Sequence, residues 1–471
     1  MSVHVVPLRI SSALLGEMHY CRVLHRPNQS NDVFDDVVAT SQVLFRVAMT
    51  YLLTRRIRGN SEVLDVAPGR AHDEHPRGGE YLLRLIPVRD FRLVWSAGVI
   101  SQLGDWSARL ALALLVLDRS GNAVTVGIVG VLFIVPWLGI GQALTAWSTK
   151  FTKKVVLIAC DSFRGVAFVL IGFVDLPTPI LLATVFLAAL ADPAFEATKS
   201  AFITELVPKD DYPSAIQMVH VANQASSLMG YAIGGVLVAL VGPASTLVLN
   251  GVSFLLSSLL IVFLSVVGVQ ERTGKAAASF AAGRDYLRTD AVSAVAFAAT
   301  VLAVATAMSV ESQVAVYGTV VAGFGEQTIG LLSAMTPAAT LGWVAMMKTS
   351  GRDSRLVYRG LLTASLAAAG GSILFFFGVG GVLAFVGFAL VGIMFSFVPM
   401  TNVVVGRRLP DENRVSIFSI LQSGVFLGLS VGALLGGILS DAVSPESAAG
   451  GALAVGALGL FLAIPLLTTR L

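Results

Sequence analysis

Long apolar runs separated by short polar breaks fill the chain from Leu93 to its last residues. Each run is long enough to cross ~30 Å of hydrocarbon as a helix. Helix is the expected form because lipid offers no hydrogen-bond partner to backbone N–H and C=O groups. The runs predict twelve transmembrane helices, over residues 93–117, 123–147, 154–174, 178–198, 214–241, 245–268, 291–317, 325–347, 356–377, 380–402, 415–440 and 447–467.

The polar breaks differ in charge, and the difference alternates along the chain. One set carries nearly all the lysines and arginines between the runs, including Lys150, Lys209, Arg284 and Arg408. The other set carries Arg119 and essentially no further basic residue. Because positively charged loops stay in the cytoplasm, we expect an even number of spans in the cell (inner) membrane, with both termini on its cytoplasmic side.

Glycine and proline recur at the same spacing in two stretches of the chain. Phe195, Pro208, Gly230, Gly234, Gly235 and Pro243 reappear as Phe397, Pro410, Gly432, Gly436, Gly437 and Pro445, at a constant offset of 202 residues. A second half that repeats the first in the same orientation is typical of a two-lobed transporter. Since small residues four apart let helices approach closely, we interpret the six repeated glycines as helix-packing positions.

The repeat and the loop charges predict the same division of the chain. We expect an all-α polytopic membrane protein with one six-helix lobe in residues 89–268, a cytoplasmic central loop in 269–290 and a second six-helix lobe in 291–471. Residues 1–88 are polar, with acidic and basic residues in near balance. We interpret them as a disordered leader. The alternatives are a membrane-surface helix over 34–56 and an artefact of the start site.

Composition excludes several classes of function. The chain is 55% hydrophobic and only 13% charged, against ~25% charged in an average soluble domain. A net charge of +3 is too small to suggest nucleic acid as a partner. No phosphate-binding Gly-x-x-x-x-Gly-Lys-Ser/Thr loop is present, and Cys21 and Cys160 lack metal-site spacing. We therefore expect the lipid bilayer as a partner, no cofactor or metal, and no enzymatic activity.

Three of the ionisable residues within the apolar runs are candidates for proton coupling. Asp105 is predicted near mid-bilayer, Arg109 follows one helical turn later, and Glu311 is the only carboxylate in its run. Such a residue costs several kcal/mol, about 3 on insertion scales, unless it faces a cavity or a partner. We interpret all three as proton-coupling candidates. The alternatives are a permanent Asp105–Arg109 pair and a Glu311 side chain that reaches the membrane surface.

Further polar residues give a candidate gate and a candidate cavity. Toward the cytoplasmic ends of the spans lie the loop and gate candidates Lys150, Lys153, Lys154, Asp161, Arg164, Glu196 and Lys199. Structural pairing of Asp161 with Arg164, and a purely orienting role for the lysines, are the alternatives. Polar side chains within the spans give the substrate-cavity candidates His220, Asn223 and Gln313.

Local motifs carry a resemblance to a known family. The segments Phe91 to Trp95 and Ser101 to Trp106 resemble the first helix of exporters in the major facilitator superfamily. The order and spacing of later matches extend the resemblance over about residues 89–471, at Phe195 to Pro208, Gly230-x-x-x-Gly234-Gly235, Ala281 to Arg288 and Gly330 to Gly342. The enterobactin and macrolide exporters are the most similar subgroup. The chain departs from the family's motifs at Thr145, Thr149, Ser226 and Tyr231.

The resemblance implies a monomeric transporter that moves a small organic, amphipathic molecule outward by alternating access. Proton antiport is the expected driving force. Two alternatives remain: a sensor or scaffold that keeps the transporter fold without transport, and an importer or uniporter.

Overall fold

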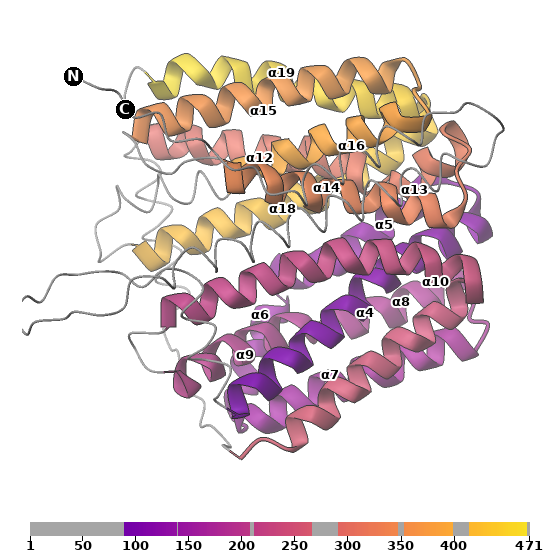
Figure 1. Ribbon diagram of the computed structural model, residues 1–471, viewed down its shortest axis with the longest axis vertical. Coiled ribbons are helices and arrows are strands. Elements are labelled where there is room, and N and C mark those ends of the chain that lie inside the picture. Colours follow the sequence, from indigo (N-terminus) through magenta and orange to yellow (C-terminus); the bar gives the residue numbers. More distant parts are fainter. Residues whose placement is uncertain are drawn as a thin grey trace, which may run out of the picture. The chain divides into compact units, whose positions relative to one another are not determined.

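The computed structural model describes residues 89–138, 140–207, 212–265, 291–346, 353–398 and 414–468, where all regular secondary structure is helical. The predicted leader 1–88 and the predicted central loop 269–290 lie outside the described residues. Eight helices of the described part are long and apolar enough to cross a membrane. The prediction of an all-α polytopic membrane protein is therefore confirmed (Figure 1).

Each of the twelve predicted spans coincides with helical structure. The first lobe contains α4 (Arg89–Ser120), α5 (Ala123–Ile134), η1 (Val135–Leu138), α6 (Ile140–Ser148), α7 (Lys153–Phe173), α8 (Thr178–Ala189), α9 (Asp192–Leu206) and α10 (Tyr212–Val262). The second contains α12 (Ala291–Glu311), α13 (Val314–Val316), η3 (Tyr317–Val321), α14 (Glu326–Met346), α15 (Asp353–Phe376), α16 (Gly381–Phe395), α18 (Arg414–Ala442) and α19 (Pro445–Thr468). Within the lobes, α4 and α7 pack on α10, while α12 packs on α18 and α15 on α19.

The fifth and sixth predicted spans are joined almost without a loop. Both belong to α10, and the break between them is Gly242, whose φ of 83° is followed by Pro243. Residues with a Cβ rarely adopt this left-handed conformation, whereas glycine does so without steric cost. The predicted break between residues 241 and 245 is thus made by one glycine.

Three other spans are interrupted within the membrane-spanning region. The second changes from α5 through η1 to α6, the fourth breaks between α8 and α9, and the seventh breaks between α12 and α13. Irregular backbone at membrane depth is tolerated where protein or a cavity surrounds it. Two carboxylates stand beside these breaks, since Asp192 begins α9 and Glu311 ends α12.

The repeated glycines pack in the same way in both lobes. A Cβ added at Gly234 would lie 2.8 Å from the Cα of Ser107 in α4, and Gly436 approaches Ser309 in α12 equally closely. Gly235 and Gly437 face the other lobe. Each glycine row thus serves one contact within its lobe and one between lobes.

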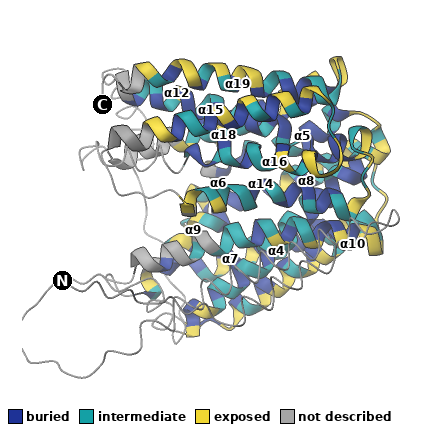
Figure 2. Cartoon of the chain, turned by 45° about the horizontal axis from the view of Figure 1, so that its top comes forward, coloured by how far each residue is buried: buried dark blue, intermediate teal, exposed yellow. Residues whose placement is uncertain are grey.

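Large apolar side chains on the outer surfaces are exposed, as expected where helices face lipid. Phe173, Leu240 and Phe377 are 75%, 71% and 80% exposed. Exposed and buried residues alternate along the helices at the outside of the molecule, such as α7 and α19 (Figure 2). The core of the second lobe is apolar, with edge-on contacts of the Tyr317 ring to Phe375 and Phe388.

Candidate functional site

The first membrane helix carries an ion pair inside an aromatic enclosure. The Arg109 Nη2 lies 3.0 Å from Asp105 Oδ2, one turn earlier on α4. The guanidinium carbon lies 4.5 Å from the ring centroids of both Trp106 and Phe133. Aromatic faces attract a cation most strongly where water is excluded, so these rings hold Arg109 in place.

Tyr231 adds a second aromatic wall to this enclosure. Its ring centroid lies 5.2 Å from that of Trp106, and the tyrosine interacts electrostatically with Arg109. Tyr231 is one of the positions at which the sequence departs from the family's motif. Its contacts place that departure beside the Asp105–Arg109 pair.

Glu311 of the second lobe belongs to the same electrostatic neighbourhood. It ends α12 at the break before α13, and it interacts with Arg109 of the first lobe and with Tyr231. Among the described residues, its carboxylate makes no hydrogen bond or ion pair. The structure therefore places Asp105 in direct contact with Arg109. Glu311 lies within electrostatic range of the same guanidinium and has no direct partner among the described residues.

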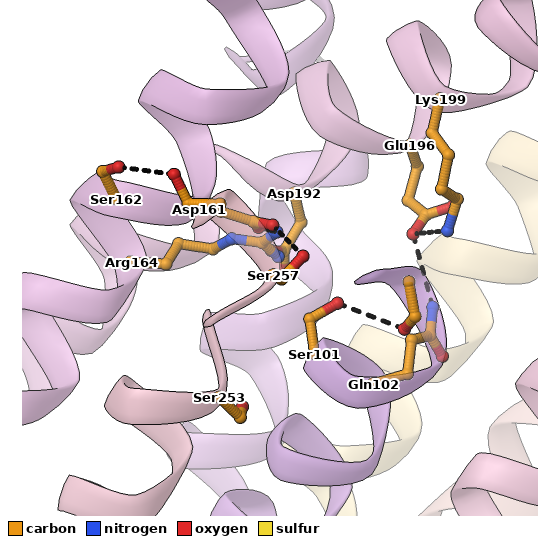
Figure 3. Close-up of polar contacts among 12 residues, drawn as sticks. Ser101, Gln102, Asp161, Ser162, Arg164, Asp192, Glu196, Lys199, Ser253 and Ser257 are labelled. Atoms are coloured by element: carbon orange, nitrogen blue, oxygen red, sulfur yellow. Dashed lines mark hydrogen bonds and ion pairs between the residues drawn. The ribbon is translucent and has the colours of Figure 1, made fainter. Parts of the chain in front are cut away.

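A buried charge cluster lies beside this neighbourhood in the first lobe, because Asp192 interacts electrostatically with both Asp105 and Arg109. Arg164 of α7 pairs with both Asp161 and Asp192, and Ser257 of α10 donates a 2.5 Å hydrogen bond to Asp161 Oδ2 (Figure 3). The guanidinium also lies 4.3 Å from the ring centroid of Phe254. The predicted Asp161–Arg164 pair is present, and Asp192 extends it to a third helix, α9. Sequence reasoning missed this link, although an aspartate within an apolar run was its visible signal.

The remaining gate candidates pair within the first lobe. Lys199 Nζ lies 2.6 Å from Glu196 Oε1, which also accepts a 3.3 Å hydrogen bond from Gln102 (Figure 3). Lys153 pairs with Glu205, and Lys154 donates a 2.8 Å hydrogen bond to the Leu264 carbonyl oxygen. Lys150 is exposed, just after the end of α6.

The three cavity candidates do not form one group. Asn223 lines a small cavity with Lys199 and Trp95 in the first lobe. Gln313 is 3% exposed and approaches Gly127 of α5, and its Oε1 has no hydrogen-bond partner in the described residues. The side chain of His220 lies outside the described part of the structure.

Comparison with known proteins identifies the family. The model of the Major Facilitator Superfamily matches residues 94–403. An uncharacterized MFS-type transporter of Bacillus subtilis (strain 168), YfiS, is 23% identical over 355 residues, which cover 73% of this chain and 84% of YfiS.

Solved structures share the fold at low sequence identity. A mutant of the nucleoside transporter NupG gives a TM-score of 0.64 at 13% identity, covering 81% of this chain and 99% of NupG. A bacterial homolog of the human lysosomal transporter Spinster, inward-facing and occupied, gives 0.61 at 14% identity, covering 82% and 95%. Together with the family match, the helical architecture shows that this chain belongs to the Major Facilitator Superfamily and is a multi-pass membrane transporter.

Proposed function

We propose that the protein exports a small, organic, amphipathic molecule through the cell membrane in exchange for protons, as a secondary active transporter of the enterobactin and macrolide exporter type. The observation that carries this proposal is the single neighbourhood formed by Asp105, Arg109 and Glu311. Asp105 and Arg109 come from the first lobe and form an ion pair, and Glu311 comes from the second lobe. The loop charges support an orientation with both termini in the cytoplasm.

In this proposal Glu311 carries the proton. An ionised Glu311 is attracted to Arg109 across the lobes. Once Glu311 is protonated, this attraction is lost and Arg109 interacts only with Asp105. Adding or removing one proton therefore changes the attraction between the lobes at this point. A ligand or proton shifts a conformational equilibrium only through such a difference between the two states.

The aromatic enclosure is the proposed substrate contact. Trp106, Phe133 and Tyr231 offer apolar ring surface beside charged groups, a combination suited to an amphipathic molecule. Asn223, Gln313 and His220 are proposed to add polar contacts during transport. The ion pairs of Lys153 and Lys199 are proposed to hold the cytoplasmic end of the first lobe.

Reconstituted vesicles test the proposal, with a macrolide and a catecholate siderophore as the first probes. We expect probe addition to drive proton movement across the membrane in the parent protein. Glu311→Gln, which removes the titrating group, should abolish this proton movement while retaining probe binding. Asp175→Asn, a carboxylate change at an exposed ion pair, is the control and should leave both measurements unchanged.

Four outcomes would contradict the proposal. Loss of proton movement in Asp105→Asn but not in Glu311→Gln would move the coupling site to the first lobe. Flux without proton movement would indicate a uniporter, and inward accumulation driven by protons an importer. Probe binding without any flux would indicate a sensor that keeps the transporter fold.

A further inference from the structure

The first turn of α5 is capped by residues from both lobes. Within the first lobe, Asn122 Oδ1 accepts a 2.9 Å hydrogen bond from the backbone N–H of Thr125. From the second lobe, the Asp441 carboxylate accepts hydrogen bonds from the backbone N–H groups of Ala123, at 2.8 Å, and Val124, at 3.0 Å. The first N–H groups of a helix have no partner inside the helix. The cap of α5 is therefore completed only while Asp441 is in contact.

A close seam between α5 and α18 sets the position of Asp441. A Cβ added at Gly437, one turn before Asp441, would lie 2.9 Å from the Cα of Val124. Likewise, a Cβ added at Gly127 would lie 2.6 Å from the Ala433 carbonyl oxygen. Glycine has no side chain, so the backbones of the two helices can touch at these positions. Any larger residue there would push the helices apart. This contact holds the Asp441 carboxylate over the end of α5.

The equivalent seam in the repeat has no such carboxylate. Gly235, the counterpart of Gly437, packs on the Glu326 carbonyl oxygen and on Gly330 of α14, each 2.7 Å from an added Cβ. The position that corresponds to Asp441 at the offset of 202 residues is Ala239. The two seams thus share their glycine packing, and among the described residues a charged side chain makes a hydrogen bond across the lobes in the α5–α18 seam but not in the α10–α14 seam.

We propose that Asp441 is a gating residue, whose carboxylate holds the lobes together at this end of the transporter and must release α5 before the cavity opens there. The two hydrogen bonds are charge-assisted, and they meet the positive end of the α5 dipole. Alternating access moves one lobe against the other about a central site. Separation of α5 from α18 breaks both hydrogen bonds at once. Asp441 therefore favours the state in which the two lobes are in contact at the α5–α18 seam.

A cysteine placed in the α5–α18 seam reports how often the lobes separate there, and the measurement needs no substrate. Val126 of α5 is 2% exposed and clusters with Val316 of the second lobe, so a cysteine of similar size at position 126 is reached only when the lobes separate. The experiment uses full-length Val126→Cys protein in vesicles, with Cys21 and Cys160 replaced by alanine, and a maleimide probe. Asp441→Asn keeps the shape of the side chain but turns an amide NH2 toward a backbone N–H. We expect labelling about tenfold faster than in the parent, in line with the loss of hydrogen bonds to a charged group.

A matched control separates this effect from a general loss of charge. Asp175 forms its ion pair with Arg119 within the first lobe, close to the end of α4 that leads into α5. Asp175→Asn should therefore leave the labelling rate within about twofold of the parent. Because no transport is measured, failure of the proposed export function would leave this result unaffected.

Equal labelling rates in the parent and in folded Asp441→Asn would overturn the proposal. Equal acceleration by Asp441→Asn and Asp175→Asn would also overturn it. If Asp441→Asn cannot be recovered as folded protein, Asp441→Glu replaces it. That variant keeps the charge but shifts it by one methylene, and its labelling must again exceed that of the parent.

Discussion

The two lobes share one helical plan but hold themselves together differently. All six ion pairs in the described residues lie in the first lobe, two of them at the buried Arg164. The described part of the second lobe packs through alanine, aromatic rings and close glycine contacts. Its carboxylate at the end of α12, Glu311, has no hydrogen-bond or ion-pair partner among the described residues. The first lobe therefore neutralises its membrane charges internally, whereas the second presents a charge to the first.

The largest expected effect comes from breaking the buried charge cluster. Arg164→Leu leaves Asp161 and Asp192 buried without their cation, and we expect a loss of about 3–5 kcal/mol in the free energy of unfolding. Thermal unfolding in detergent measures this loss. Removing all three charges, with Asp161→Asn and Asp192→Asn added, should restore much of it.

The control for Arg164 is the exposed pair of the same lobe. Arg119→Leu breaks an ion pair whose Asp175 side chain is 91% exposed, so we expect a loss below about 1 kcal/mol. Equal losses in Arg119→Leu and Arg164→Leu would mean that burial does not distinguish the two pairs.

The glycine packing of the second lobe should give an intermediate effect. Gly436→Val drives a side chain into Ser309 of α12, and we expect a loss of about 1–3 kcal/mol from overpacking. Gly451→Val is the matched variant, because a Cβ added at Gly451 meets no atom within 4 Å. Similar unfolding temperatures for the two variants would show that the glycine row does not determine packing in this lobe.

The smallest effect on stability is expected at Glu311. Glu311→Gln removes a charge that has no ion-pair partner among the described residues, so we expect unfolding to change by less than about 1 kcal/mol. Asp161→Asn, which weakens contacts to Arg164 and Ser257, should cost more. Strong destabilisation by Glu311→Gln would mean that Glu311 is a structural residue and would remove the contrast between the lobes.

The apolar runs and the repeated glycines and prolines predicted the fold closely. All twelve apolar runs coincide with helical structure, and the break at Gly242 falls between the predicted spans 214–241 and 245–268. The breaks before Asp192 and after Glu311 were not predicted, because an apolar run reads the same whether its helix is continuous or broken.

The parts of the candidate site that depend on contacts between distant helices could not be predicted from the sequence. The Asp105–Arg109 pair was predictable, since four residues along a helix bring two side chains to one face. The approach of Glu311 to Arg109, and of Asp441 to α5, depends on packing between lobes, which no local pattern specifies. Asp192 was visible as a carboxylate, but its partner lies on another helix.

The one-residue turn at Gly242 joins the two parts of α10 directly, without a loop between them. On one side of it, Gly235 rests on α14 of the opposite lobe, and on the other, Gly251 rests on Gly165 of α7, with Ser257 bonded to Asp161 further along. Because no flexible loop separates the two parts of α10 at Gly242, this single element connects the lobe boundary directly to α7, the helix that holds Arg164. A longer linker inserted at this turn would disconnect the two arms while leaving each of their contacts in place.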